Sequence, residues 1–273
     1  MPNPSPLAAY ESLLAFWADG GVDAMLLEAP VDRIAAGRIA PPQPPARKAA
    51  PASTAKPTVG SGQPDVAAAV AEAQARAAEA SDLDQLAAAI AAFDGCPIKF
   101  EGAARQSVFY RGRPDAPVMV IGEGPGAEED AQGLPFVGRA GQLLDRMLAA
   151  AGLTERVLIT NTVFWRPPGN RTPAAHEQMI CAPFLERAIA LVKPQMLLLV
   201  GGASAKSLLR REEGILSMRG RWFEWKSADG SLELPALPTL HPAFLLRQPA
   251  AKKRAWIDLL TLTERLDRAE RPS

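Results

Sequence analysis

The sequence predicts a three-layer α/β/α sandwich around a central, mainly parallel sheet of about four strands. From residue 117 onward, short apolar runs alternate with segments whose apolar residues recur at helical spacing. Strands that alternate with helices pair in parallel, because each helix returns the chain to the same edge of the sheet. Polar residues and glycines directly follow three of the runs, at the edge where open α/β folds bind ligands.

The elements can be assigned in order from these patterns. The predicted strands are the apolar runs 118–121, 157–160, 196–200 and 237–240. The predicted helices lie near 140–151, 177–191, 203–211 and 251–267. The ends of three of these strands are therefore expected to bring their loops together at one pocket.

The first 93 residues differ in composition from the rest. Residues 1–39 begin with apolar residues at helical spacing and predict an N-terminal helical segment. Residues 40–65 are rich in proline and alanine, which cannot build a core, and predict a flexible linker. The alanine-rich stretch 66–93 predicts one or two helices that begin the main domain, 66–273.

Composition limits the class of protein. With 273 residues and 48% hydrophobic content, the chain can bury one ordinary core. No apolar stretch is long enough to span a bilayer and no secretory signal is recognisable, so we expect a monomeric cytoplasmic protein without a membrane role. The formal net charge is zero, so any affinity for nucleic acid must come from a local basic patch.

The most informative segment follows the first predicted strand and reads Gly122-Glu123-Gly124-Pro125-Gly126-Ala127-Glu128-Glu129-Asp130. A dinucleotide loop would need a third glycine and a helix start free of negative charge. Here three acidic residues occupy that helix start, and Pro125 removes an amide donor. The loop therefore favours a neutral, planar ligand over a phosphate.

Four ordered segments resemble the family 4 uracil-DNA glycosylases. They are the loop just described, the run 133–141 that contains Pro135-Phe136-Val137-Gly138, the run 161–173 that contains Arg166-Pro167-Pro168-Gly169-Asn170-Arg171, and His241-Pro242-Ala243-Phe244-Leu245-Leu246. The resemblance covers about residues 94–265. It implies a DNA repair glycosylase that hydrolyses the N-glycosidic bond of uracil without a covalent enzyme intermediate, and leaves an abasic site.

The residue types suit that chemistry. An enzyme that removes a base must flip the nucleotide, stack the base, read its edge and stabilise the departing anion. Phe136 offers a stacking face, Asn161 can accept from N3–H and donate to O4, and His241 can donate to O2. The alternatives are a turn-capping role for Asn161 and a structural role for His241.

The resemblance places catalytic weight on Glu123, Glu129, Asn170 and His241, and substrate binding on Gly124. Backbone amides near Glu123 and Gly124 are expected to bind uracil, and Glu129 is the preferred carboxylate to stabilise the cationic sugar and orient water. The alternative for the acidic run is a helix N-terminus favoured by the macrodipole, and we expect at least one of its residues to have only that role.

A DNA-binding surface is expected around this pocket. Its predicted phosphate contacts are Arg139, Arg166, Arg171 and Arg247, with Lys252, Lys253 and Arg254 at the rim. Leu245 and Leu246 are candidates to fill the space left by the flipped base, and core packing is an equal alternative. The expected partner is uracil-containing DNA, single- or double-stranded.

The cysteines depart from the family pattern. Family members usually hold a 4Fe-4S cluster with four cysteines, including a C-x-x-C pair. This chain has only Cys96 and Cys181, and Trp165 stands where the third cysteine is expected. We therefore predict no cluster and no cofactor, with Trp165 filling part of the vacated space. A cluster with Asp94 or His176 as substitute ligands is the alternative.

A second class of function competes with the enzyme. The domain could be a noncatalytic module that binds DNA or a polymerase, tethered through the linker and the N-terminal helix, which could itself contact a protein partner. The presence of Asn161, His241 and Glu129 together favours the enzyme. A small-molecule or nucleotide-binding protein is disfavoured by the acidic loop.

Overall fold

The computed structural model describes residues 65–270. The predicted helical segment 1–39 lies outside the described residues, as does the linker 40–65 except for Asp65. Asp65 is the N-cap of the first described helix, because its Oδ1 accepts a hydrogen bond from the amide of Ala68 at 3.1 Å.

The central sheet has six strands in the order β1-β3-β2-β4-β6-β5. They are β1 Tyr110–Gly112, β2 Val118–Gly122, β3 Val157–Asn161, β4 Met196–Val200, β5 Phe223–Lys226 and β6 Glu233–Thr239. The four central strands are parallel, while β1 and β5 pair antiparallel at the two edges.

The predicted number of about four strands is therefore wrong, and the two additional strands explain why. Strand β1 has three residues and is partly exposed, and β5 alternates half-buried and exposed positions around Trp225. Neither edge strand is covered on both faces, so neither has the continuous apolar run by which the four buried parallel strands can be found. The parallel core itself is confirmed.

Helices connect and flank these strands. The α-helices are α3 Val66–Glu79, α4 Leu83–Ala92, α5 Ala127–Gln132, α6 Arg139–Ala150, α7 Ala175–Val192, α8 Gly202–Leu209, α9 Ile215–Met218, α10 Pro242–Arg247 and α11 Lys252–Glu270. Short 3₁₀ turns lie at Pro97–Phe100, Thr154–Arg156, Pro168–Asn170 and Pro249–Ala251. None of the described helices is both long and apolar enough to cross a bilayer.

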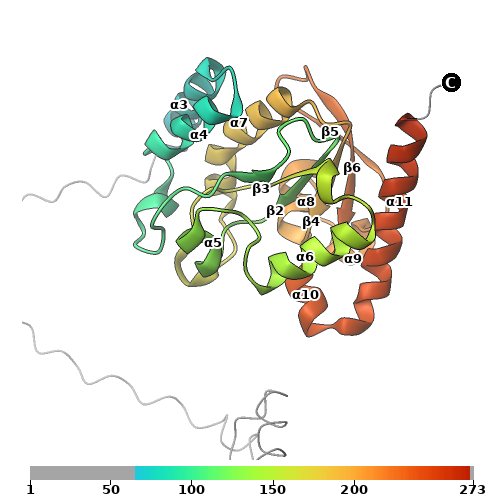
Figure 1. The fold of residues 1–273 in the computed structure, drawn as a ribbon. Helices are drawn as coiled ribbons and strands as arrows, with labels where there is room; N and C mark the ends of the chain where they lie inside the picture. The colour runs from blue at the N-terminus through green and yellow to red at the C-terminus, as the bar shows by residue number, and fades with distance from the viewer. Residues whose placement is uncertain (1–64, 271–273) are drawn as a thin grey trace, which may run out of the picture. The chain divides into compact units, whose positions relative to one another are not determined.

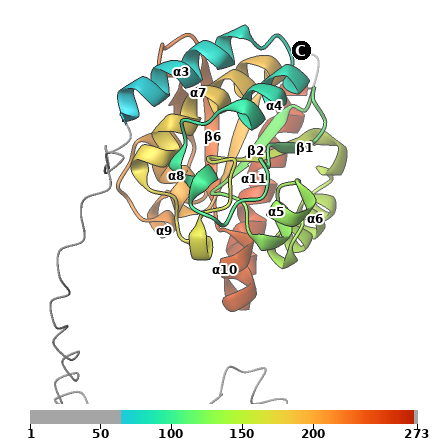
Figure 2. The ribbon, with the colours of Figure 1, turned by 90° about the vertical axis from the view of Figure 1, so that its left-hand side faces the viewer.

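The helices form layers on both faces of the sheet (Figures 1 and 2). Alternate strand residues such as Met119 and Ile121 pack with α3, α4, α7 and α8, while Val118 and Val120 pack with α6 and α11. This separation of neighbouring side chains onto two cores produces the predicted α/β/α sandwich.

The alanine-rich stretch forms two helices, which lie beside α7 in both views (Figures 1 and 2). Small alanines such as Ala73 and Ala77 are buried, which allows α3 to lie close to its neighbour. Arg187 of α7 donates two hydrogen bonds to the carbonyl oxygen of Ala80 between α3 and α4. Both helices therefore belong to the main domain.

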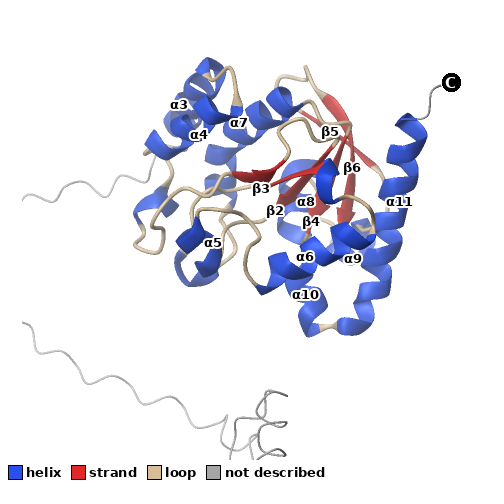
Figure 3. Cartoon of the chain, in the orientation of Figure 1, coloured by secondary structure: helices blue, strands red, loops and turns tan. Residues whose placement is uncertain are grey.

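The parallel strands all end at the same edge of the sheet (Figure 3). Strand β2 ends at Gly122, β3 at Asn161 and β6 at Thr239. The loops that follow these three strands carry the predicted site residues, so the topology places them together.

Candidate functional site

A cleft of about 670 Å³ opens at the carboxyl ends of the strands. It is formed by the loop after β2, the segment 136–140, the loop after β3 and the start of α10. Its volume lies in the ordinary range for sites that bind small molecules. The three predicted loops therefore do converge on one site.

Asn161, the last residue of β3, does not line the cleft and is fully buried. Neither its Nδ2 nor its Oδ1 has a hydrogen-bond partner among the described residues. Buried amides are normally paired, because an unpaired one costs about 1–3 kcal/mol. The turn-capping alternative for Asn161 would require such a pairing, and the described residues do not provide it.

Gly122 brings the amide and an aromatic ring together. A Cβ atom at position 122 would lie 2.4 Å from Cζ of Phe136 and 2.6 Å from Oδ1 of Asn161. Any larger residue would therefore displace one of the two groups. The ring of Phe136 lies 5.7 Å from that of His241, with 33° between their planes. Phe136, Asn161 and His241 are thus gathered as the sequence predicted.

His241 caps helix α10 through its side chain. The amide of Ala243 donates to Nδ1 at 3.1 Å, so the proton of the neutral imidazole lies on Nε2. Burial, together with the positive charge of Arg247, lowers the pKa of His241 to about 4, although the charge of Glu129 acts in the opposite direction. At neutral pH the residue is therefore an uncharged hydrogen-bond donor.

This pKa predicts how stability depends on pH. Because the pKa of His241 is about 4 when folded and 6.5 otherwise, the unfolded chain binds the proton more tightly. The contribution of His241 to the free energy of unfolding is therefore fully present above pH 6.5. It is lost as the pH drops toward 4, which lowers the free energy of unfolding by up to about 3 kcal/mol at about 1.4 kcal/mol per pKa unit. The free energy of unfolding, measured with urea across this pH range, should fall less in His241→Ala than in the wild type. Equal falls in the two proteins would contradict this prediction.

The three acidic residues of the loop have different environments. Oε1 of Glu129 accepts the amides of Val137 and Gly138 at 3.0 and 2.9 Å, and its Oε2 accepts that of Gly126 at 3.1 Å. Asp130 is buried and accepts the amide of Arg105 at 2.8 Å. The expectation that at least one of these residues has a purely structural role fits Asp130.

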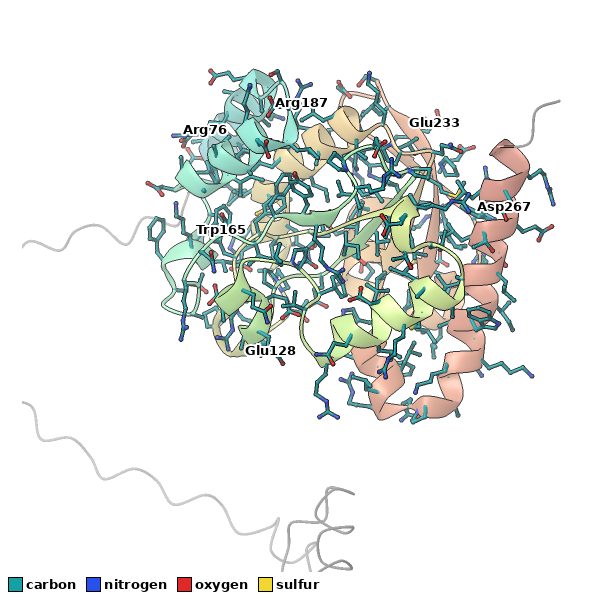
Figure 4. The ribbon with its side chains drawn as sticks, viewed as in Figure 1. Arg76, Glu128, Trp165, Arg187, Glu233 and Asp267 are labelled. Carbon is teal, nitrogen blue, oxygen red and sulfur yellow. The ribbon has the colours of Figure 1, made fainter. Side chains whose placement is uncertain are left out.

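Glu128, labelled in Figure 4, is exposed and lines the cleft from the start of α5. Glu129 faces the cleft, but three amides already occupy its two oxygens. The structure therefore gives its carboxylate a loop-fixing role that sequence reasoning missed.

Glu123 and Gly124 also line the cleft. The hydroxyl of Thr162, the residue after Asn161, donates to the carbonyl oxygen of Glu123 at 2.6 Å and ties this loop to the end of β3. Asn170 lies exposed at the rim with a left-handed backbone, and its Oδ1 accepts from Nε of Arg166 at 2.8 Å. These residues are therefore close to the cleft, as predicted.

The predicted DNA-binding arginines fall into two groups. Arg139 and Arg247 are exposed and line the cleft, and the rim residues Lys252, Lys253 and Arg254 are exposed in the first turn of α11. Arg166 is half-buried and is bonded to Asn170.

Arg171 differs from the expectation of a free phosphate contact. Its guanidinium donates to both oxygens of the buried Glu177, at 2.8 and 2.6 Å, and to Glu101 at 2.8 Å. Burial acts to raise the pKa of Glu177, but the bonds from Arg171 and from the amide of Ala174 lower it overall. Two carboxylates thus compensate the charge of Arg171 and anchor it to α7.

The two predicted wedge residues, Leu245 and Leu246, differ in burial. Leu245 is fully buried and packs with Leu143, Leu240 and Ala255, whereas Leu246 is 36% exposed. The prediction of Leu245 as a wedge is therefore wrong, because its side chain is core, and the alternative of core packing holds. Of the two predicted wedge residues, only Leu246 is exposed to solvent.

Gly201 is a further residue that sequence reasoning missed. It follows β4 with a φ of 101°, and a Cβ there would lie 3.2 Å from Cβ of His241. The signal was present in the sequence, since Gly201 and Gly202 directly follow the run 196–200. A residue larger than glycine would strain the backbone and press on the histidine.

The two cysteines lie together but do not form a cluster site. Their Sγ atoms are 3.9 Å apart and both residues are fully buried. Burial and the neighbouring Cys96 raise the pKa of Cys181, which favours the neutral thiol over the thiolate that binds metals. Across residues 65–270, no three His, Cys, Asp or Glu side chains are grouped so as to hold a metal ion.

Lys99 and Trp165 occupy this part of the domain. The two positions that could complete a C-x-x-C pair with Cys96 hold Phe93 and Lys99, and Nζ of Lys99 lies 5.9 Å from the Trp165 ring centroid. That amine also donates to the carbonyl oxygens of Ala91 and Phe93 and to Asp94. Trp165, labelled in Figure 4, is buried, and its ring centroid lies 6.4 Å from that of Phe93. These residues do not fit a 4Fe-4S cluster.

The proposed substitute ligands are also directed elsewhere. The side chain of Asp94 is 73% exposed and forms an ion pair with Lys99 at 2.7 Å. His176 is exposed at the start of α7. Neither side chain is grouped with the two thiols in the described structure.

Comparison with known proteins places these features in a family context. The model of the uracil DNA glycosylase superfamily matches residues 109–260. The type-4 uracil-DNA glycosylase of Pyrobaculum aerophilum is 39% identical over 184 residues, which cover 65% of this chain and 91% of that protein. That of Thermotoga maritima is 37% identical, over 54% of this chain and 75% of its own length. That of Sulfurisphaera tokodaii is 38% identical, over 52% and 66% respectively.

Proposed function

The chain belongs to the uracil DNA glycosylase superfamily, and from this we propose that it is a DNA repair enzyme, a uracil-DNA glycosylase that releases free uracil by hydrolysing its N-glycosidic bond. The observation that carries the proposal is the unpaired, buried amide of Asn161 beside the ring of Phe136. One amide group can both donate and accept, which is what the edge of uracil requires. The product is an abasic site for base excision repair.

Recognition begins with a flipped nucleotide. In the proposed complex, the base stacks on Phe136 while Asn161 accepts from N3–H with Oδ1 and donates to O4 with Nδ2. Cytosine presents a donor in place of O4 and an acceptor in place of N3–H, so both hydrogen bonds would be reversed. The desolvation cost of an unpaired amide then becomes a cost of binding the wrong base.

Bond cleavage leaves negative charge on the uracil ring. His241 is held by the amide of Ala243 with Nε2–H as its donor, and in this proposal that donor meets O2 as the charge develops. A neutral imidazole suits this role because it needs no reorganisation of charge before the reaction. Backbone amides near Glu123 and Gly124 complete the environment of the departing anion.

The sugar becomes cationic as the bond breaks. Glu129 supplies a fixed negative charge beside the cleft, held in place by three amides. Its two oxygens offer about four acceptor sites and three are used, so one stays open, and we assign the positioning of water to Glu129 together with Glu123 and Asn170, which also line the cleft. Hydrolysis then proceeds by direct attack of water at the sugar, without a covalent enzyme intermediate.

The DNA strand is proposed to lie across the mouth of the cleft. Arg139 and Arg247 are the proposed phosphate contacts, with the basic start of α11 farther along the rim. Contacts of this kind give salt-dependent affinity without sequence preference, which suits a search for rare lesions. Leu246 is the proposed wedge into the base stack.

We further propose that this member of the superfamily works without a 4Fe-4S cluster. The pairing of Lys99 with Asp94 and the burial of Trp165 support this, since a cation and an aromatic ring lie near the two cysteines in place of further thiolates. Protein purified anaerobically from iron-supplemented cells should contain far less than one cluster per chain by iron and sulfide analysis, and remain active. Stoichiometric iron and sulfide would contradict the proposal.

Oligonucleotides that carry a single uracil test the enzymatic function. The protein should release free uracil and leave the strand cleavable by alkali at that position, while matched thymine and cytosine strands remain intact. Folded protein that binds DNA but releases no uracil would overturn the enzyme and support the noncatalytic DNA- or polymerase-binding module. A cytoplasmic location, a monomeric state and a protein partner of residues 1–39 remain predictions from the sequence.

A further inference from the structure

Phe136 adopts a backbone conformation that bulky residues avoid. Its φ is 55°, in the left-handed region. Lys193 and Arg210 share this conformation, but both are C-caps of helices, where it is common. Phe136 lies in the segment between α5 and α6, so its conformation must be imposed by neighbouring groups.

Arg111 contacts the carbonyl groups on either side of this residue. Its Nε donates to the carbonyl oxygen of Pro135 at 2.7 Å, and its Nη2 donates to that of Phe136 at 3.1 Å. Nη2 also donates to Oδ1 of Asp145 at 2.5 Å. One guanidinium therefore joins edge strand β1, the segment that carries Phe136, and helix α6.

Other groups hold the same segment from its remaining sides. The carboxylate of Glu129 accepts hydrogen bonds from the amides of Val137 and Gly138, which follow Phe136. The guanidinium of Arg111 binds the carbonyl oxygens of Pro135 and Phe136 itself. Gly141 of α6 lies directly against the segment, because a Cβ there would be only 1.7 Å from the carbonyl oxygen of Phe136. These contacts restrain rotation of the Phe136 carbonyl group.

We propose that Arg111 is a positioning residue of the glycosylase, which holds Phe136 in its left-handed conformation so that the ring is ready to stack on uracil. Arg111 does not line the cleft, and its side chain is 23% exposed, so it acts through Phe136 and not through the substrate. This inference rests on the proposed function, because the position of the Phe136 ring affects activity only if a base stacks on it.

A double-mutant cycle tests the proposal. Arg111→Ala should lower kcat/KM for uracil release by about 10- to 100-fold and raise the inhibition constant of free uracil, because a misplaced ring binds the base less well. In the Phe136→Ala background, the same change should alter kcat/KM by less than about twofold. Effects of Arg111→Ala that are equal in both backgrounds would overturn the proposal, since a general loss of structure does not depend on the ring.

Arg113→Ala is the matched control. This arginine directly follows β1, which contains Arg111, and it too pairs with an aspartate, Asp115, at 2.6 Å, but its side chain is 51% exposed and no described contact joins it to Phe136. It should retain wild-type kcat/KM. Arg111→Lys keeps the positive charge but loses the planar guanidinium that reaches both carbonyl groups. Its kcat/KM should lie between those of the wild type and Arg111→Ala. If Arg111→Ala fails to fold, Arg111→Lys replaces it in the cycle.

The failure of this inference can be told apart from failure of the proposed function. A wild-type protein without glycosylase activity would overturn the function, whereas an active enzyme with an additive cycle would overturn only the role of Arg111. A crystal structure of Arg111→Lys or Arg111→Ala gives an answer that does not require activity. Phe136 should leave the left-handed region or become disordered, and an unchanged Phe136 would overturn the proposal.

Discussion

Replacing Asn161 with aspartate is expected to abolish uracil release, with a loss on the order of 10³-fold or more in kcat/KM. The amide is fully buried and has no hydrogen-bond partner among the described residues, and in the proposed complex its two polar atoms pair with the base. An aspartate carboxylate has no donor for O4 of uracil and would face that oxygen with negative charge. Single-turnover release of uracil from a labelled oligonucleotide measures the effect.

A buried carboxylate can also disturb folding, so Asn161→Ala belongs beside Asn161→Asp. The smaller variant removes both hydrogen bonds without adding charge, and should lose activity while its thermal unfolding remains cooperative. Binding to DNA that contains an abasic site should stay close to wild type in both, because no base remains to be read. Uracil release within tenfold of wild type by either folded variant would contradict the assigned role of Asn161.

Removal of the His241 side chain is expected to lower kcat by about 10²- to 10³-fold, the effect of losing one preformed donor to a developing anion. The neutral imidazole donates through Nε2 because the amide of Ala243 occupies Nδ1. Its low pKa also predicts that activity is flat above pH 6, since the ring does not titrate there. Steady-state kinetics of the wild type and of His241→Ala on uracil DNA, both measured from pH 6 to 8, test the two statements.

His176→Ala is the control for this change. His176 is the other histidine of the chain, and it is exposed at the start of α7. It should keep full activity. A loss of kcat equal to that of His241→Ala, or a kcat of His241→Ala close to wild type, would remove His241 from the proposed chemistry.

Much of the site could be predicted from the sequence because it depends on strand ends. Buried parallel strands are continuous apolar runs, and the residues after them, including Glu123, Asn161 and His241, necessarily meet at one edge of the sheet. Phe136 was found through its place in a recognisable motif. The edge strands β1 and β5 were missed because they are short and only partly covered.

The parallel core, the order of the loops around the cleft and the family can all be predicted from local patterns along the chain. The contacts that individual side chains make there become visible only in the folded structure. Leu245 is core, and the carboxylate of Glu129 is occupied by backbone amides. Arg111 reaches carbonyl groups more than twenty residues away along the chain. Such contacts depend on distances across the fold, which the spacing of residues along one chain does not contain.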